Sequence, residues 1–198
     1  MNKYKAMHKN CKRGRPTSYG MQDPELVFNE LALKAGDVFL DVGCGVGDYS
    51  LHAAKLVGDS GRVHALDQSP DLVRSLAERA EEVGVSNLTV TVADITQPLP
   101  VPDSSVDVCF VATVLHIPGV KKHADQLFAE LRRVLVDGGT AVIIECSSKD
   151  LSFGPPEAMR LSEDEVEAMA ARCGFEATKR VDLGFNYLIN QQLGQPGG

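Results

Sequence analysis

The strongest constraint on the fold of this chain is a strand-like run that leads directly into a glycine-rich turn and a helix-like segment. Residues 38–42 read Val-Phe-Leu-Asp-Val, glycines stand at 43, 45 and 47, and residues 47–57 have a helical pattern. A sharp turn from strand to helix needs residues that tolerate a positive φ, and a ligand approaches the backbone closely only where no Cβ intervenes. The stretch therefore predicts a nucleotide-type cofactor site at the carboxyl end of a β-strand.

Two carboxylates in this stretch, Asp41 and Asp48, indicate the kind of cofactor. The dinucleotide pattern G-x-G-x-x-G needs a third small residue at position 48, where this chain has Asp. A carboxylate there would repel a pyrophosphate at the helix N-terminus, which argues against an NAD-type nucleotide-binding protein. A cofactor with an ammonium and a sulfonium but no phosphate tolerates both acids, and S-adenosylmethionine (SAM) fits that description.

Asp41 lies inside an apolar strand, where a carboxylate is costly unless it has partners. We expect those partners to be the backbone N–H groups of the glycine loop and, indirectly, the ammonium of the cofactor.

The rest of the chain alternates strand and helix patterns. Strands are expected at 38–42, 62–67, 88–93, 106–114, 140–146, 175–183 and 185–193. Helices are expected at 23–33, 47–57, 69–84, 122–136 and 162–174. This alternation predicts one α/β domain with an open, mostly parallel sheet, helices on both faces and an antiparallel C-terminal hairpin.

Composition places the chain in a broad class. Its 198 residues are 43% hydrophobic and 24% charged, and no apolar run approaches the roughly 20 residues that span a bilayer. The N-terminus has no apolar leader segment, and the five cysteines form no C-x-x-C pair. We therefore expect a reduced, cytoplasmic protein without a metal site. The cysteines are Cys11, Cys44, Cys109, Cys146 and Cys173.

The charge is unevenly distributed, because residues 1–15 contain six basic residues and no acid within a chain of net charge −7. This basic arm could contact RNA, an anionic substrate or a membrane surface, or it could be a solvated tail. We favour the tail, since chain ends are commonly disordered. The predicted organisation is an arm at 1–20, a catalytic domain at 21–193 and a short tail at 194–198.

Four sequence blocks carry a family resemblance. They are Leu40–Gly47, Ala65–Asp67, Ala93-Asp94 and Leu131–Gly139, in that order and spacing. The chain resembles the class I SAM-dependent methyltransferases, close to the type-11 group with its ubiquinone- and menaquinone-biosynthesis-like enzymes. The resemblance implies a Rossmann-like, seven-stranded sheet of order 3-2-1-4-5-7-6.

The resemblance also implies how the cofactor is bound. The methionine moiety would lie on the glycine loop, the ribose on Asp67, and the adenine between Gln68 and the backbone of Asp94 and Ile95. From the residues alone, Asp67 could instead cap the turn before the helix that starts at Pro70, and Asp94 could form an Asx-turn. The expected cofactor-binding residues are Asp41, Gly43, Cys44, Gly45, Gly47, Asp67, Gln68, Asp94 and Ile95.

Catalytic residues are less constrained, because methyl transfer is an in-line displacement at an already activated sulfonium. A general base is needed only when the acceptor must lose a proton. His116, after the fourth strand, and Glu145, at the end of the fifth, are the candidates. Strand alternation suggests that at most one of Glu145 and Cys146 is functional, and Cys44 reads as a space-filling residue.

The methyl acceptor is the open question. No inserted cap is visible, so the acceptor pocket would be roofed by the N-terminal segment with Tyr19 and Met21, by the 147–161 loop with Phe153 and Met159, or by a second subunit. We favour a small-molecule acceptor over RNA or protein reached by the basic arm. Residues 112–115 read Ala-Thr-Val-Leu and lack the Asn-Pro-Pro-Tyr-type motif of amino-methylating nucleic-acid enzymes. An arsenic acceptor ranks low, since the cysteines fall in strands.

Overall fold

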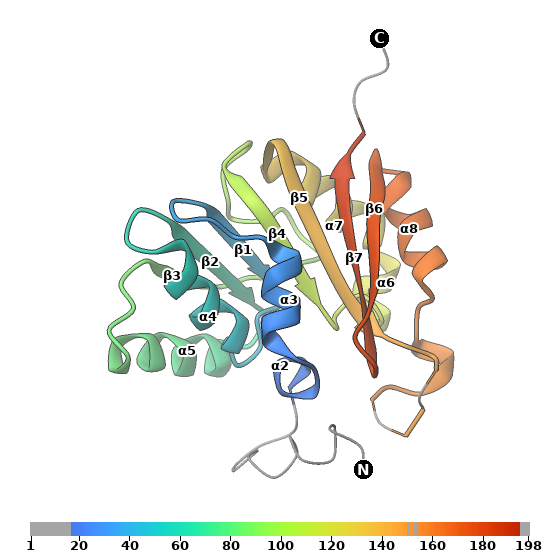
Figure 1. Cartoon of the computed structure of the whole chain (residues 1–198), viewed down its shortest axis with the longest axis horizontal. Coiled ribbons are helices and arrows are strands. Elements are labelled where there is room, and N and C mark those ends of the chain that lie inside the picture. Colours follow the sequence, from blue (N-terminus) through green and yellow to red (C-terminus); the bar gives the residue numbers. More distant parts are fainter. Residues whose placement is uncertain (1–16, 150, 153, 195–198) are drawn as a thin grey trace.

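The computed structural model describes residues 17–149, 151–152 and 154–194. Seven strands form one sheet of order β3-β2-β1-β4-β5-β7-β6 (Figure 1). The pairs from β3 to β5 are parallel, whereas β7 runs antiparallel to both β5 and β6. This confirms the sheet order and the antiparallel hairpin expected from the sequence. The strands are β1 Val38–Val42, β2 Arg62–Asp67, β3 Leu88–Val92, β4 Val106–Ala112, β5 Leu135–Cys146, β6 Phe175–Asp182 and β7 Asn186–Leu193.

Helices cover both faces of the sheet, because the inner strands are apolar on both sides. One face packs against α3 (Pro24–Leu31), α4 (Asp48–Val57) and α5 (Pro70–Glu82), with Val27, Phe39 and Leu76 among its buried side chains. The opposite core contains side chains of α6 (Pro118–Lys122), α7 (Ala124–Val134) and α8 (Glu163–Ala171). Two short elements complete the fold, α2 (Ser18–Met21) and the 3₁₀ turn η2 (Glu157–Met159).

Three helices begin as their sequence signals predict. The Asp23 side chain accepts from the Glu25 N–H before α3, and Ser69 caps α5 in the same way through Leu72. Ser162 and Glu165 form the expected capping box at the start of α8. Local hydrogen bonds from capping side chains therefore set these helix starts, and the capping residues can be recognised in the sequence.

The segment between β4 and β5 differs from the sequence-based expectation. The single helix predicted at 122–136 is instead α6 and α7, joined at His123, and β5 begins at Leu135 rather than at 140. Leu135 already pairs with Val106, while Thr140 pairs with Val108, so the intervening glycines form a bulge in the strand. Sheet pairing, which is not local in sequence, sets this boundary.

The fourth strand was predicted to reach residue 114, but β4 ends at Ala112. Thr113 adopts a φ of +55°, which turns the chain out of the sheet. The backbone beyond it then crosses the carboxyl edge of the sheet toward α6.

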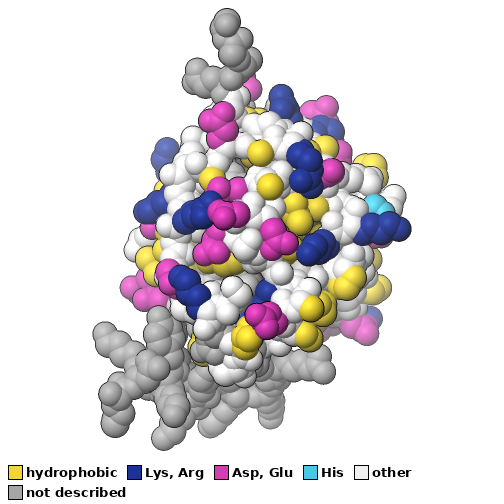
Figure 2. Space-filling view, turned by 90° about the vertical axis from the view of Figure 1, so that its right-hand side faces the viewer, with side chains coloured by type: hydrophobic (Ala, Val, Ile, Leu, Met, Phe, Trp, Pro, Cys, Tyr) yellow, Lys and Arg dark blue, Asp and Glu magenta, His cyan; other side chains and the backbone are white. Residues whose placement is uncertain are grey.

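The exposed edge strand β6 is rich in charge. Lys179 pairs with Glu30 at 2.7 Å, and Arg180 pairs with Asp164 and Glu167. Figure 2 shows acidic and basic side chains interspersed on this side of the molecule. Charges on an edge strand oppose pairing with further strands.

Of the described residues that the sequence assigned to the arm, Thr17 caps α2 and residues 18–20 belong to that helix. The rest of the predicted arm, Cys11 and Phe153 lie outside the described residues. Within the part of the chain that the structure describes, every helix is too short or too polar to cross a membrane.

Candidate functional site

The glycine loop after β1 is held against the end of β2. The N–H groups of Gly43 and Cys44 both donate to Leu66 O at 2.8 Å, and the Gly45 N–H donates to Asp67 Oδ2 at 2.9 Å. The three glycines have φ values of +77°, +56° and +78°, so each adopts a conformation that glycine alone enters without strain. The loop therefore presents its backbone at the carboxyl edge of the sheet.

The space around each glycine differs. A Cβ on Gly43 would lie 2.7 Å from Val114 Cγ1, and one on Gly47 would lie 2.3 Å from Leu76 Cδ1. A Cβ on Gly45 would meet no atom within 4 Å. Gly43 and Gly47 are thus required by packing, whereas Gly45 faces open space.

Asp41 is buried, but its partner is not the one that the sequence suggested. The Ser50 hydroxyl donates to Asp41 Oδ2 at 2.5 Å, while the loop N–H groups bond to Leu66, Cys44 and Asp67 instead. The prediction of glycine-loop partners was therefore wrong, because the loop curls toward β2 and leaves the Asp41 side chain facing α4. Burial raises the pKa of Asp41 to about 7, with the Ser50 hydrogen bond opposing the shift.

Asp48, the residue that argued against a dinucleotide, is paired with a cation. Arg79 of α5 donates to Asp48 Oδ1 at 2.7 Å and to Val46 O at 2.5 Å. The same guanidinium thus ties the glycine loop and the start of α4 to α5.

Two adjacent cavities lie over the carboxyl ends of the strands. The first, of about 270 Å³, is bounded by the ends of β2 and β3 and by the start of α6. The second, of about 300 Å³, is bounded by the glycine loop, the end of β4 and residues 17–19. Gly43, Asp67 and Val114 line both, so the cavities form one trough across the sheet edge.

Most of the predicted cofactor residues line this trough. The first cavity contains Gly43, Asp67, Gln68, Asp94 and Ile95, and the second contains Asp41, Gly43, Cys44, Gly45 and Asp67. Gly47 lines neither, and the space beside it is filled by the Leu76 side chain.

Asp67 and Asp94 both accept backbone hydrogen bonds. Asp67 accepts from Ser69 N at 2.8 Å through Oδ1 and from Gly45 N through Oδ2, so it joins the turn before α5 to the glycine loop. Asp94 Oδ1 accepts from the N–H and the hydroxyl of Thr96, as in an Asx-turn, and these bonds lower the pKa of Asp94. Both alternatives considered from the sequence, a helix-start turn and an Asx-turn, are therefore present, and both carboxylates still line the first cavity.

Several lining residues were not predicted. Ile117, Gly119, Val120 and His123 bound the first cavity from α6 and its flanks. The Ile117-Pro118 pair places Pro at the first position of α6, which is a helix-start signal that could have revealed this element. Thr17 and Ser18 join the predicted Tyr19 over the second cavity. Tyr19 Oη lies 3.1 Å from His52 Nδ1, which holds this segment against α4.

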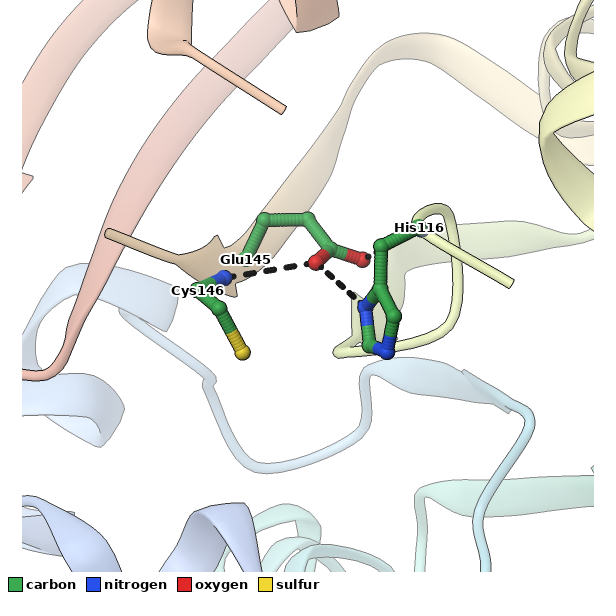
Figure 3. Close-up of side chains that lie close together, drawn as sticks. All are labelled: His116, Glu145 and Cys146. Atoms are coloured by element: carbon green, nitrogen blue, oxygen red, sulfur yellow. Dashed lines mark hydrogen bonds and ion pairs between the residues drawn. The ribbon is translucent and has the colours of Figure 1, made fainter. Parts of the chain in front are cut away.

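His116, Glu145 and Cys146 lie together at the ends of β4 and β5 (Figure 3). His116 Nδ1 lies 2.8 Å from Glu145 Oε2. The imidazole and the Cys146 thiol project to the same side of the carboxylate. Glu145 and Cys146, the last two residues of β5, therefore both lie in one cluster with His116.

Glu145 is fully buried and heavily hydrogen-bonded. Its Oε1 accepts from the N–H groups of Leu115 and His116 at 2.7 and 3.3 Å, and its Oε2 accepts from Cys146 N at 3.3 Å. A carboxylate beside Nδ1 stabilises the tautomer with the proton on Nδ1, which leaves Nε2 as an acceptor. His116 does not itself line the trough, but Val114 and Ile117 on either side of it do.

The 147–161 segment folds back against this cluster. Arg160 donates to Ser147 O and to Pro155 O, and a Cβ on Gly154 would lie 3.7 Å from Cys146 Sγ. Burial raises the pKa of the Cys146 thiol to about 11, with the nearby Arg160 guanidinium opposing the shift.

Comparison with known proteins identifies the architecture. Residues 33–188 match a family model described as a methyltransferase domain. The chain belongs to this methyltransferase family. A crystal structure of a SAM-dependent methyltransferase from Aquifex aeolicus superposes with a TM-score of 0.80 at 28% identity, over 96% of this chain and 98% of that one.

Two curated relatives agree with this assignment. A probable cobalt-precorrin-6B C(15)-methyltransferase from Sulfurisphaera tokodaii is 25% identical over 78% of this chain and 77% of its own length. A demethylmenaquinone methyltransferase from Geobacillus stearothermophilus is 30% identical over 65% of this chain and 53% of its own length. The methyltransferase is thus a SAM-dependent enzyme of the class I, type-11-like group, with SAM as its cofactor.

Proposed function

We propose that this methyltransferase holds SAM along the trough, with the adenosine in the first cavity and the methionine in the second. The adenine would lie between Gln68 and the Asp94-Ile95 backbone, and the ribose hydroxyls would donate to Asp67. The methionine moiety would lie against Gly43, Cys44 and Gly45. The open space at Gly45 supports this placement, since a ligand there meets backbone rather than a side chain.

Asp41 would contribute charge to the methionine end. Asp41 is among the residues that line the second cavity, and a cofactor ammonium nearby would favour the ionised form of its carboxyl. Ser50 holds this carboxyl in place from below.

The acceptor is a small organic molecule that enters from the second cavity, between residues 17–19 and the end of β4. Its nucleophile attacks the methyl carbon in line with the sulfonium, and the C–S bond breaks to release S-adenosylhomocysteine. The methionine moiety would fill part of this cavity of about 300 Å³, and the space left beside it suits a small acceptor rather than a polymer. The protein's main contribution is orientation and the exclusion of water.

The buried pair of Glu145 and His116 is the observation that carries the proposed chemistry. Glu145 would fix the imidazole through Nδ1. His116 lies next to Ile117, which lines the trough, and a small rotation of its side chain would let Nε2 accept a proton from the acceptor's O–H or N–H group. Such a pair is useful only when the acceptor is protic at neutral pH. We therefore infer a hydroxyl, phenol or amine as the acceptor group.

Calorimetry with SAM, S-adenosylhomocysteine and NAD tests the cofactor site. We expect SAM and S-adenosylhomocysteine to bind and Asp67→Asn to weaken both. Binding of NAD tighter than that of SAM would overturn the proposal.

A turnover assay tests the proposed base. A panel of small hydroxyl, phenol and amine compounds is screened for the formation of S-adenosylhomocysteine, and His116→Gln is compared with the wild type. We expect kcat to fall by roughly 10²–10⁴-fold, with the Kd for SAM unchanged. His64→Gln, which alters a histidine of β2, is the matched control. Equal activity of His116→Gln and wild type would remove His116 from the mechanism.

The cellular compartment and the oligomeric state are also proposals. The described cysteines Cys44, Cys109, Cys146 and Cys173 are all free thiols, which supports a reducing compartment such as the cytoplasm. A macromolecular acceptor reached through residues 1–15, or a homodimer that completes the roof, stands as the alternative. Deletion of residues 1–15 tests the macromolecular acceptor, and a mass measurement in solution tests the homodimer.

A further inference from the structure

The cluster of His116, Glu145 and Cys146 contains the donor atoms of a metal site. One imidazole nitrogen, one carboxylate oxygen and the Cys146 sulfur all lie within 4.8 Å of one another. Among the described residues, no other group of three such side chains meets this criterion. The three residues come from the β4–α6 loop and the end of β5, so the spacing in sequence does not reveal them.

We propose that these three side chains bind a divalent metal ion of the zinc type. A thiolate and an imidazole are ligands that Zn²⁺ prefers, and three protein ligands plus water describe an open tetrahedral site. This proposal differs from the sequence-based expectation of no metal site, and it does not depend on the acceptor chemistry proposed above.

Metal binding would require small movements of the ligand atoms. Tetrahedral zinc with bonds of about 2.0–2.3 Å places its ligand atoms about 3.5 Å apart. Glu145 Oε2 and His116 Nδ1 are 2.8 Å apart, so the ion would replace the proton between them and the two atoms would move apart. Cys146 sits at the end of β5, and rotation of its side chain can bring the sulfur closer.

The surroundings are suited to holding the ligands. Glu145 is anchored by three backbone N–H groups, and His116 is anchored by one of the same bonds. The Cys146 sulfur faces the backbone of Gly154 in the folded 147–161 segment, which limits access from solvent. With three protein ligands, a tetrahedral ion would keep one water ligand.

Binding of a metal ion at this site and proton acceptance by His116 exclude each other. With the ion bound at Nδ1, the neutral imidazole carries its proton on Nε2, so Nε2 can no longer accept a proton from the methyl acceptor. The ion-loaded protein is therefore expected to be a poor methyltransferase, and chelation should restore its activity.

Cobalt substitution tests the site directly. The full chain is stripped with a chelator and titrated with Co²⁺, whose bond to a thiolate gives a charge-transfer absorption in the near ultraviolet. We expect one Co²⁺ per chain with this band, and displacement by Zn²⁺. Absence of the band in the wild type would overturn the proposal.

Variants assign the ligands. Cys146→Ser should abolish the band, whereas Cys173→Ser, a change at a partly exposed free thiol outside the cluster, should leave it intact. A band that survives in Cys146→Ser would overturn the assignment. If Cys146→Ser fails to fold by circular dichroism, His116→Gln provides the second variant. Retention of an unchanged Co²⁺ affinity and band in His116→Gln would equally contradict the site.

Discussion

The hydroxyl of Ser50 donates to the buried carboxyl of Asp41 across 2.5 Å, joining the first turn of α4 to the end of β1 beneath the glycine loop. Asp41 is 3% exposed and Ser50 is 0% exposed, so a charge on Asp41 has little contact with water. The ionised form is therefore disfavoured in the folded protein without cofactor, and its pKa lies near 7.

Asp41→Asn should stabilise the cofactor-free protein increasingly as the pH rises. The folded pKa is raised from 3.8 to about 7, so between these values the unfolded chain loses a proton that the folded chain retains. Wild-type stability is thus lost across this window, at about 1.4 kcal/mol per pH unit relative to the Asn variant. Urea unfolding of both proteins at pH 4.5 and 7.5 measures the difference. Asp59→Asn, at an exposed position, should show no such trend, and parallel curves for wild type and Asp41→Asn would contradict the prediction.

Binding of SAM below pH 7 should release a proton from the wild type. If the cofactor ammonium lies near Asp41, it lowers the pKa of a carboxyl that is otherwise about half protonated near pH 7. Calorimetry at pH 6.5 in two buffers of different ionisation enthalpy counts the protons. An unchanged proton count in Asp41→Asn would show that another group is responsible.

Alanine substitutions at Gly45 and Gly47 should separate ligand binding from packing. Gly47→Ala forces a Cβ into Leu76 at 2.3 Å, so we expect a loss of about 2–4 kcal/mol in the free energy of unfolding. Gly45→Ala meets no protein atom and should lose only about 1 kcal/mol, from its positive φ. Its main effect should be a rise of tenfold or more in the Kd for SAM. Thermal unfolding and calorimetry test both, and a Gly45→Ala protein with native SAM affinity would place the cofactor elsewhere.

Gln191→Met should stabilise the protein. Gln191 of β7 is 0% exposed, and neither atom of its amide has a hydrogen-bond partner among the described residues. Methionine has a similar length without the unsatisfied polar atoms, so the gain should be about 1–3 kcal/mol. The neighbouring Gln192→Met, on the opposite and exposed face, should change stability by less than about 0.5 kcal/mol. Chemical unfolding measures the stability of both variants. Equal effects would imply that the Gln191 amide has hydrogen-bond partners.

Arg133→Lys should destabilise the loop between β3 and β4, residues 93–105. The Arg133 guanidinium donates to the carbonyls of Leu99 and Val101 and to the carboxylates of Asp103 and Glu130. Lysine cannot reproduce this fork of donors, so we expect a loss of about 1–3 kcal/mol. Arg132→Lys serves as the neighbouring control, since Arg132 makes a single bond to Cys173 O. Similar melting temperatures for the two variants would contradict the role of Arg133.

Local sequence patterns predicted much of the fold. The apolar runs located the strands, and Asp23, Ser69 and Ser162 marked helix starts that the structure confirms. Family resemblance supplied the order of the strands. Where pairing between distant segments competes with local pattern, the sequence was a poor guide. The early start of β5 at Leu135 and the division of the helix at His123 are examples.

The candidate site likewise has features that local sequence predicts and features that it does not. The glycine loop and the acids at the strand ends could be identified from local sequence, because positive φ, tight turns and parallel-strand geometry leave few alternatives. The contacts of each acid could not be identified in this way. Asp41 faces Ser50 rather than the loop, Asp48 faces Arg79, and Glu145 meets His116 and Cys146. Side-chain partners arise from the packing of elements far apart in the chain, and periodicity along one segment carries no information about them.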